Sequence, residues 1–367
     1  MNKIKYISIP RNSRIIVISD IHGELELFKR LLDKVNYNDK EDYLIINGDL
    51  CEKGRNSKGV VEYILKLTSN NSKVHVTEGN CDTLVEDLIE ENPKLINYLV
   101  ARKNSLLNEW LIELDFNITD KTTVQSIKEV LIHNYSKEIK WLSELPTAIE
   151  TEDYIFVHAG LDSIENWKET DRLKAISLSA FLEKTHSANK YVIVGHWPVV
   201  NYSEEIFSHN PIINPTKRII AIDGGNVIKQ TGQLNAFIIN RGSVEDTFNH
   251  LYIDQFPEVK VTKDFEADSK MIGSVSYPKF EIQPVEKGTD FTLSKQLNTN
   301  QLLYVKNEYI QRNDSGAYFV KTDLSCSQIN LNTGEIVSVI DDACSGYSLV
   351  KKDGVVGWVP KESLADF

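Results

Sequence analysis

Five short polar motifs lie along the first part of the chain, and four of them directly follow a run of apolar, β-favouring residues. The runs cover residues 15–19, 43–47, 154–157 and 191–194, and the motifs after them are Asp20-Ile21-His22-Gly23, Gly48-Asp49, His158-Ala159-Gly160 and Gly195-His196. The fifth motif, Gly79-Asn80, follows an alternating segment at residues 74–76. Because parallel α/β sheets present their chemistry at the carboxyl ends of the strands, the motifs predict one polar site at a sheet edge.

Strands and helices are expected to alternate through this part of the chain, as in a parallel sheet covered by helices. Apolar residues at helical spacing predict helices over residues 24–35 and 58–67, between strands at 14–19, 43–47 and 73–77. Residues 83–145 are expected to be mostly helical, and a helical segment at 173–184 separates the strands that precede His158 and His196. Further strands are expected at 219–222 and 234–240. Short strands replace the helical pattern after about residue 245, and residues 260–283 give no assignable pattern.

Composition limits the partners and the compartment. The 367 residues are 41% hydrophobic, which is enough for a sizeable core, and they carry a formal net charge of −12. Nucleic acid and anionic membranes repel such an acidic chain, so neither is expected as a partner. The N-terminus lacks the apolar stretch of a signal peptide, no run of about 18 apolar residues occurs, and the four cysteines lack zinc-ligand spacing. We therefore expect a cytoplasmic protein.

The motifs supply oxygen and nitrogen donors suited to two divalent ions. The candidate ligands share a place just after a predicted strand, and they are Asp20, His22, Asp49, Asn80, His158 and His196. Asp20 and His22 stand two residues apart, so both can turn toward one ion. Carboxylate and imidazole together favour manganese, iron or zinc over calcium or magnesium. We expect two ions, with manganese first and iron or zinc as the alternatives.

In this order the motifs resemble those of the calcineurin-like metallophosphoesterases, in the branch of phosphoprotein phosphatases and symmetrical dinucleoside-tetraphosphate hydrolases. The resemblance covers roughly residues 14–240, against the patterns G-D-x-H-G, G-D-x-x-D-R-G, G-N-H-E/D, H-G/A-G and a late G-H. This chain has Ser19-Asp20-Ile21-His22-Gly23, Gly48-Asp49-Leu50-Cys51-Glu52-Lys53-Gly54, Gly79-Asn80-Cys81-Asp82, His158-Ala159-Gly160 and Gly195-His196. The resemblance implies that Asp20 and His22 hold the first metal, that Asp49 bridges, and that Asn80, His158 and His196 hold the second.

The resemblance also implies an α/β fold, a metallophosphoesterase β-sandwich of mixed sheets flanked by helices, over residues 1–245. Residues 317–367 resemble an SH3-like domain, a small all-β barrel at the C-terminus, through the segments 334–340 and 354–360. The β-rich region 246–316 connects the two. An SH3-type groove would dock an extended peptide on Tyr318, Tyr347, Trp358 and Pro360, although the same aromatic residues could instead fill a barrel core.

By the same resemblance, a hydroxide that bridges the two ions attacks phosphorus, and nearby cations offset the phosphoryl charge. The catalytic residues that it implies are Asp49, Asn80, Cys81, Asp82, Lys53 and Arg55. Cys81 stands where a histidine usually protonates the leaving oxygen, and a thiol is a poorer acid for that task. Lys53 stands where an arginine usually grips phosphate, and Arg55 could replace that arginine.

Three functions remain open. The first interpretation is a metal-dependent phosphomonoesterase, a serine/threonine phosphoprotein phosphatase, because the motif at His196 lacks a further histidine that many superfamily members carry. Cys81 instead favours a phosphodiesterase or a dinucleoside-polyphosphate hydrolase. The third is a non-catalytic, metal-bound scaffold whose SH3-like domain binds a partner. The expected substrate is a phosphorylated protein or a small phosphoester, with a peptide partner for the SH3-like domain.

Overall fold

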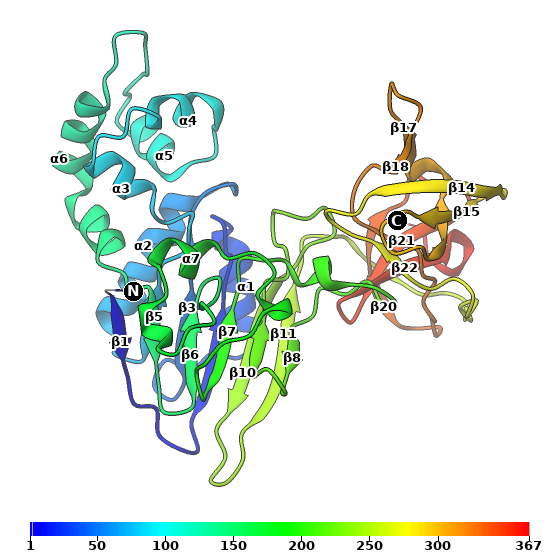
Figure 1. The fold of residues 1–367 in the computed structure, drawn as a ribbon, viewed down its shortest axis with the longest axis horizontal. Coiled ribbons are helices and arrows are strands. Elements are labelled where there is room, and N and C mark those ends of the chain that lie inside the picture. Colours follow the sequence, from blue (N-terminus) through cyan, green and yellow to red (C-terminus); the bar gives the residue numbers. More distant parts are fainter. Residues whose placement is uncertain (2, 367) are drawn as a thin grey trace. The chain divides into compact units, whose positions relative to one another are not determined.

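The computed structural model describes residue 1 and residues 3–366, and the chain divides into two compact units (Figure 1). Unit 1 comprises Met1–Trp197, Pro211–Ile228 and Leu234–Ile253. Unit 2 comprises Pro198–Asn210, Lys229–Gln233 and Asp254–Phe367. The three-part division of the sequence at residues 245 and 316 stays a prediction.

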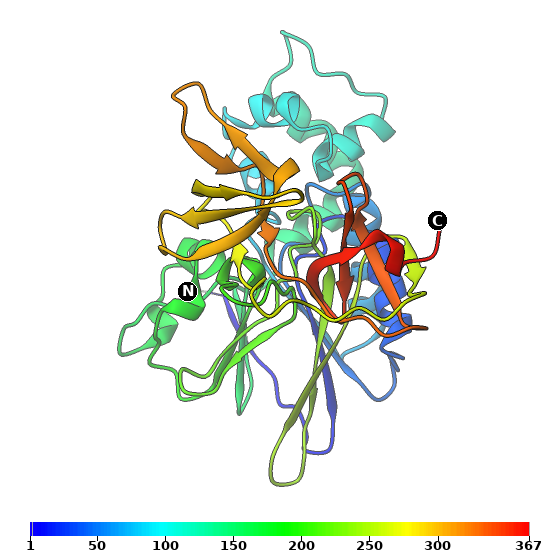
Figure 2. The ribbon, with the colours of Figure 1, turned by 90° about the vertical axis from the view of Figure 1, so that its right-hand side faces the viewer.

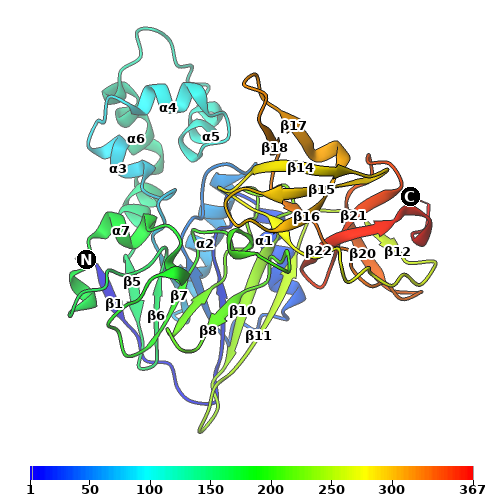
Figure 3. The same cartoon turned by 45° about the vertical axis from the view of Figure 1, so that its right-hand side comes forward.

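Two mixed sheets form the centre of unit 1 (Figure 3). The first has five strands in the order β11-β10-β2-β3-β4, and β2, β3 and β4 are parallel. These strands are β2 (Arg14–Ile18), β3 (Tyr43–Asn47), β4 (Val74–Thr77), β10 (Leu234–Asn240) and β11 (Thr247–Ile253). The second has six strands in the order β1-β5-β6-β7-β9-β8, with β6, β7 and β9 parallel. Its strands are β1 (Ile4–Tyr6), β5 (Ala148–Glu150), β6 (Tyr154–Val157), β7 (Tyr191–Val194), β8 (Ile212–Asn214) and β9 (Ile219–Ala221).

Successive residues of a strand point to opposite faces of its sheet, and β2 shows how this builds the layers. Val17 is buried in one cluster with Phe156 and Ile193 of the other sheet. Its neighbours Ile16 and Ile18 belong to a second cluster, which contains residues of the helices. The apolar runs of the sequence are therefore strands that are buried on both faces.

Helices cover the outer face of the five-stranded sheet and extend beyond it. The helices of unit 1 are α1 (Leu25–Lys34), α2 (Ser57–Asn70), α3 (Leu84–Ile89), α4 (Leu95–Ala101), α5 (Leu106–Glu113), α6 (Val124–Ser143) and α7 (Arg172–Ser177). Short 3₁₀ helices lie at Trp167–Glu169 and Phe181–Glu183. In Figure 1 the helices α3 to α6 gather at one end of unit 1, away from the tip of the β10–β11 hairpin. The side chain of Thr123 caps α6 by accepting a hydrogen bond from the backbone nitrogen of Ser126.

The expected parallel strands and flanking helices of the α/β region are confirmed, with one addition and two differences. The sequence left open which sheet holds the strands that precede His158 and His196, and these strands are neighbours in the second sheet. The helical segment expected at 173–184 is interrupted, because Ala180 adopts a left-handed backbone conformation with φ of 54°. The strand β1 was not expected, since its three residues form a strand by pairing with β5 rather than through a local pattern.

Unit 2 is built from antiparallel sheets, which Figure 2 shows in yellow to red. A five-stranded sheet has the order β16-β15-β14-β18-β17, a four-stranded sheet has β12-β20-β21-β22, and β13 pairs with β19. The strands are β12 (Glu258–Lys260), β13 (Ser274–Val275), β14 (Glu281–Lys287), β15 (Phe291–Gln296), β16 (Leu302–Lys306), β17 (Ile310–Arg312), β18 (Tyr318–Val320), β19 (Leu324–Ser325), β20 (Ile336–Asp341), β21 (Tyr347–Lys352) and β22 (Val355–Pro360). Short 3₁₀ helices occur at Val199–Tyr202, Asn307–Tyr309 and Lys361–Ser363.

The expected SH3-like barrel is not confirmed. The strand β18 pairs with β14 and β17, whereas β20, β21 and β22 pair with one another and with β12. Trp358 is fully buried, and its Nε1 donates a hydrogen bond to the carbonyl of Ser325 at 2.8 Å. Its ring therefore belongs to the core of unit 2 and is not exposed for peptide binding.

Among the described residues, no helix is both long enough and apolar enough to cross a bilayer.

Candidate functional site

The candidate ligands of unit 1 lie on the loops that follow five strands. Asp20 and His22 follow β2, Asp49 follows β3, and Asn80 follows β4, while His158 and His196 follow β6 and β7 of the second sheet. Backbone hydrogen bonds join the first two loops, from the nitrogen of Asp20 to the carbonyl of Gly48 at 3.1 Å and from His22 to Asp49 at 3.0 Å. These hydrogen bonds join the loop that carries Asp20 and His22 to the loop that carries Asp49.

Four of these residues adopt a left-handed backbone conformation that side chains rarely take. The φ angles are 57° at Asp20, 49° at His22, 53° at Asp49 and 65° at His196. Each such residue costs on the order of 1–3 kcal/mol and persists only where the surrounding structure holds it. Strain that is concentrated on the polar side chains of one site is typical of a functional site.

Two clusters of donor atoms share Asp49. Donor atoms of His22, Asp49 and Cys81 lie within 4.8 Å of one another, and those of Asp49, His158 and His196 do the same. Nε2 of His22 is 3.7 Å from Oδ2 of Asp49, and Nε2 of His158 is 3.3 Å from its Oδ1. Two ions held side by side would therefore have this carboxylate in common.

The remaining two predicted ligands lie against these clusters. Oδ1 of Asp20 is 3.9 Å from Nε2 of His22, and its carboxylate accepts a hydrogen bond from the backbone nitrogen of His196. Asn80 directly precedes Cys81, whose backbone nitrogen donates to Oδ1 of Asp49 at 2.8 Å. The structure thus brings all six predicted ligands together.

The imidazole rings are oriented by backbone carbonyls. Nδ1 of His158 lies 2.9 Å from the carbonyl of Asn47, and Nδ1 of His22 lies 3.3 Å from that of Cys51. A ring that donates from Nδ1 keeps the lone pair of Nε2 for a metal, and such carbonyl partners are usual behind metal-bound histidines. In both residues Nε2 is the atom that faces Asp49.

Two of the predicted ligands carry a buried polar atom that has no hydrogen-bond partner among the described residues. These atoms are Nε2 of His158 and Oδ1 of Asn80. Burying a polar atom without a partner costs roughly 1–3 kcal/mol, so such atoms usually have a ligand or an ion to bind. A divalent cation between these donors would satisfy both atoms, and the nitrogen and oxygen donor set fits manganese, iron or zinc.

Glycine is required where the loops approach most closely. A Cβ atom on Gly79 would collide with Oδ1 of Asp49, and a Cβ on Gly195 would collide with Oδ2 of Asp20. Both glycines thus leave room beside the carboxylate of a predicted ligand.

Burial also sets the protonation of two ring ligands. Burial lowers the pKa of His22 to about 4 and that of His196 to about 4, against an ordinary value near 6.5. Both imidazoles are therefore neutral at pH 7, which is the form that binds a metal. Burial, with a smaller contribution from the negative charge of Asp223, raises the pKa of Asp20.

The other predicted catalytic residues, Asp82, Lys53 and Arg55, differ in burial and in their contacts with the site. Asp82 is buried and accepts hydrogen bonds from the backbone nitrogens of Leu50 at 2.8 Å and Gly79 at 2.8 Å, so it joins two ligand loops. Lys53 lines a pocket with Cys81. Arg55 is exposed and is not among the described residues that line this pocket.

No role was expected for Tyr98 and Arg102, which line the same pocket from the helical block. Their separation of four residues at the end of one helix was a signal that they share a face. Asn226 was also not assigned a role, and its Nδ2 donates to the carbonyl of Ile21 at 3.0 Å, between Asp20 and His22. Its place in the turn Asp223-Gly224-Gly225-Asn226 gave no indication of this contact.

Comparisons with known proteins agree with the geometry. A family model described as calcineurin-like phosphoesterase matches residues 13–214, which are more than half of the chain. A protein named bis(5'-nucleosyl)-tetraphosphatase, symmetrical, from Buchnera aphidicola subsp. Acyrthosiphon pisum is 48% identical over 65 residues, or 18% of this chain and 23% of that protein. Shewanella-like protein phosphatase 1 from Plasmodium berghei is 27% identical over 169 residues, or 43% of this chain and 42% of that protein.

The chain spans about a quarter of the length of the tetraphosphatase that it matches, since the alignment covers 23% of that protein. A solved protein serine/threonine phosphatase from Saccharomyces cerevisiae superposes with a TM-score of 0.43 at 11% identity, covering 69% of this chain and 85% of that one.

Proposed function

Because the chain belongs to the calcineurin-like phosphoesterase family, we propose that it is a metal-dependent hydrolase that cleaves the phosphoanhydride chain of a dinucleoside polyphosphate. The observation that carries the proposal is the pair of donor clusters that share Asp49. In this function Asp20, His22 and Asp49 hold one divalent ion, and Asp49, Asn80, His158 and His196 hold the other. We propose manganese for both positions.

When bound, the ions supply Lewis acidity to the phosphoryl oxygens and lower the pKa of a water to provide the nucleophile. The residues of the chain hold the ions and position the phosphoryl group. The left-handed loops aim the donors, the carbonyls of Asn47 and Cys51 keep Nε2 of the two histidines free, and Lys53 offsets charge on the phosphoryl group.

The substrate class follows from the relatives and from the leaving group. Relatives named symmetrical bis(5'-nucleosyl)-tetraphosphatases support a tetraphosphate cut at its centre. The water oxygen bonds to phosphorus, the bridging P–O bond breaks with its electron pair on the leaving oxygen, and the products near pH 7 are two nucleoside diphosphate trianions and the two protons of the water. A terminal phosphate oxygen has a second pKa near 6, so it leaves without the strong proton donor that Cys81 does not provide.

A second candidate is the serine/threonine phosphoprotein phosphatase that the sequence placed first. Its support is the relative named Shewanella-like protein phosphatase 1. In this function residues 317–367, expected to form the SH3-like domain, would hold the protein substrate, but the burial of Trp358 removes one of the side chains expected to bind peptide. In phosphoserine hydrolysis the leaving group is the serine hydroxyl oxygen. An alcohol oxygen needs a proton donor at the position of Cys81 in order to leave.

A substrate panel with manganese tests the proposal. The panel contains diadenosine tetraphosphate, para-nitrophenyl phosphate, its bis-ester and a phosphoserine peptide. We expect the highest kcat/KM for diadenosine tetraphosphate, with ADP as the product. Preference for the phosphopeptide would support the second candidate, preference for the bis-ester would identify a phosphodiesterase, and no turnover with any compound would support a scaffold.

A further inference from the structure

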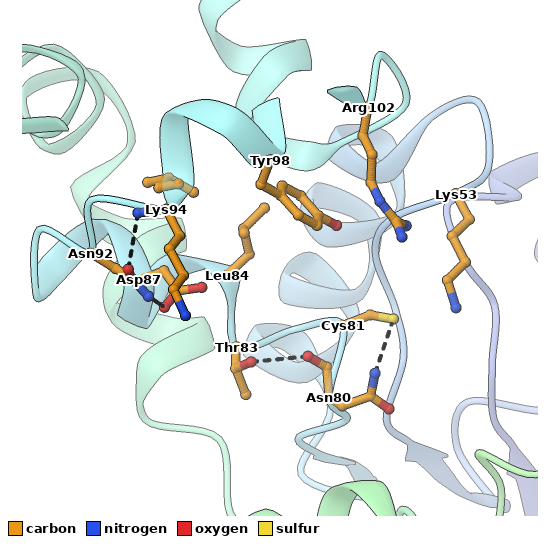
Figure 4. A pocket seen from close by; sticks show the side chains of 11 residues that line it. Lys53, Asn80, Cys81, Thr83, Leu84, Asp87, Asn92, Lys94, Tyr98 and Arg102 are labelled. Atoms are coloured by element: carbon orange, nitrogen blue, oxygen red, sulfur yellow. Dashed lines mark hydrogen bonds between the residues drawn. The ribbon is translucent and has the colours of Figure 1, made fainter. Parts of the chain in front are cut away.

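A pocket of about 380 Å³ opens beside Asn80 and Cys81, just after the end of β4 (Figure 4). Its walls come from the loop after β3, the loop after β4 and the helices α3 and α4. This volume lies in the range of small-molecule pockets. A substrate whose phosphorus lies at the candidate ligands would extend from Asn80 directly into this space.

The pocket carries a local excess of positive charge. Lys53, Lys94 and Arg102 line it, and Figure 4 shows the charged ends of Lys53 and Arg102 directed toward the same space. Among the described lining residues the acidic one is Asp87, whose Oδ1 accepts a hydrogen bond from Asn92 at 2.7 Å. The three cations form no ion pair with a carboxylate of the described chain. In a chain of net charge −12, such a pocket favours an anionic ligand.

An aromatic ring stands among these cations. Tyr98 lines the pocket, and its hydroxyl donates to Oε2 of Glu52 at 2.6 Å. Oε1 of Glu52 accepts from the backbone nitrogen of Leu106 at 2.8 Å, so both carboxylate oxygens of Glu52 have a hydrogen-bond partner. The guanidinium of Arg102 lies 5.1 Å from the centroid of the Tyr98 ring. Aromatic rings next to arginine are the usual platform on which a nucleobase stacks.

We propose that this pocket binds one nucleoside diphosphate half of the substrate, with Lys53, Lys94 and Arg102 at the phosphate oxygens and the ring of Tyr98 against the base. The inference rests on the proposed dinucleoside-polyphosphate hydrolase function and adds the residues that select the substrate. A phosphopeptide would use the cations alone, whereas a nucleotide uses the cations and the ring.

The first test compares two substrates in the manganese-loaded enzyme. Tyr98→Leu should lower kcat/KM for diadenosine tetraphosphate, relative to that for para-nitrophenyl phosphate, by at least about fivefold, since stacking on one ring contributes roughly 1 kcal/mol or more. Tyr98→Phe keeps the ring and should retain most of this preference. The matched control is Tyr6→Leu, because the Tyr6 hydroxyl also donates to a glutamate, Glu152, at 3.2 Å on an exposed strand. The control should leave both substrates unchanged.

The second test measures binding without turnover. In isothermal titration of the wild-type protein with ADP and with pyrophosphate, ADP should bind at least about fivefold more tightly. Tyr98→Leu should remove this difference, and Arg102→Ala should weaken the binding of both anions by several-fold. Thermal denaturation of each variant shows that it is folded.

The outcomes separate the inference from the function on which it rests. If the wild-type enzyme hydrolyses diadenosine tetraphosphate but Tyr98→Leu binds ADP as the wild type does, the pocket is not the nucleotide site and the inference is wrong. Equal loss in Tyr98→Phe and Tyr98→Leu would mean that Tyr98 acts through Glu52, which also overturns it. If para-nitrophenyl phosphate is hydrolysed and the tetraphosphate is not, the proposed substrate is wrong. A phosphopeptide that binds through Lys94 and Arg102, with no ADP binding, would assign the pocket to protein substrates.

Discussion

Nδ2 of Asn47 lies 3.0 Å from the carbonyl oxygen of Val157, and this hydrogen bond joins the end of β3 to the end of β6 in the other sheet. The same amide donates to the carbonyl of Ile193 at 3.1 Å, while its Oδ1 accepts from the hydroxyl of Thr77 at 3.0 Å. Asn47 is fully buried and stands two residues before Asp49. One side chain therefore couples the strands whose ends carry the candidate ligands.

Asn47→Ala should lower the free energy of unfolding by about 3 kcal/mol, because it leaves two buried carbonyls and a hydroxyl without a partner. It should also weaken manganese binding, since the two sheets lose a hydrogen-bonded contact beside the candidate ligands. Urea denaturation of the metal-free protein and manganese titration measure the two effects. Asn240→Ala, at the exposed end of β10, is the matched control and should change stability by less than about 0.5 kcal/mol. Equal stability of the two variants would contradict this role of Asn47.

Asp82→Asn should reduce manganese affinity by about 10- to 100-fold while the far-UV circular dichroism stays unchanged. The carboxylate accepts from Leu50 through Oδ1 and from Gly79 through Oδ2, and an amide cannot accept at both ends. Calorimetric titration with manganese measures the effect. Asp33→Asn, exposed on α1, provides the control. If Asp82→Asn bound manganese as tightly as this control, the two ligand loops would not depend on Asp82.

Much of the fold could be predicted because the strands of unit 1 are buried on both faces. Continuous apolar runs such as the one before Asp20 are distinctive, and the polar residue that ends each run marks a sheet edge. The positions of the six candidate ligands therefore follow from local sequence. Which sheet carries His158 could not be predicted in this way, since the choice between two sheets depends on the pairing of distant strands.

The backbone conformation of the site could not be predicted from the sequence, because it also depends on contacts between distant residues. The left-handed backbone of Asp20 and Asp49 is maintained by contacts between loops, such as the hydrogen bond from Asp20 to Gly48, and not by the residues themselves. The contact of Tyr98 with Glu52 joins residues 46 positions apart and depends on how the helical block folds back. In unit 2 the alternating strands were recognisable, but their distribution between sheets was not.

The buried ring of His75 predicts a pH dependence of stability. Burial, with a smaller contribution from Lys5, lowers the pKa of His75 to about 4, and Nζ of Lys5 lies 3.2 Å from its Nδ1. The unfolded chain, with a pKa near 6.5, binds more protons between pH 4 and 6.5, so the stability falls as the pH drops through this range. Relative to His75→Gln, the wild-type protein should lose about 2 kcal/mol between pH 7 and pH 4.5. Urea denaturation at both pH values measures this difference, and parallel losses in the two proteins would contradict the assignment.

The sharing of Asp49 by two divalent ions is the central claim, and anomalous diffraction from manganese-loaded crystals tests it most directly. The account predicts two manganese peaks about 3.5–4 Å apart, both within bonding distance of the Asp49 carboxylate, with Asn80 Oδ1 and His158 Nε2 among the donors. In Asp49→Asn at least one peak should be lost, and activity should fall by at least about a hundredfold. A single peak in the wild-type crystals, or two peaks remote from Asp49, would contradict the account.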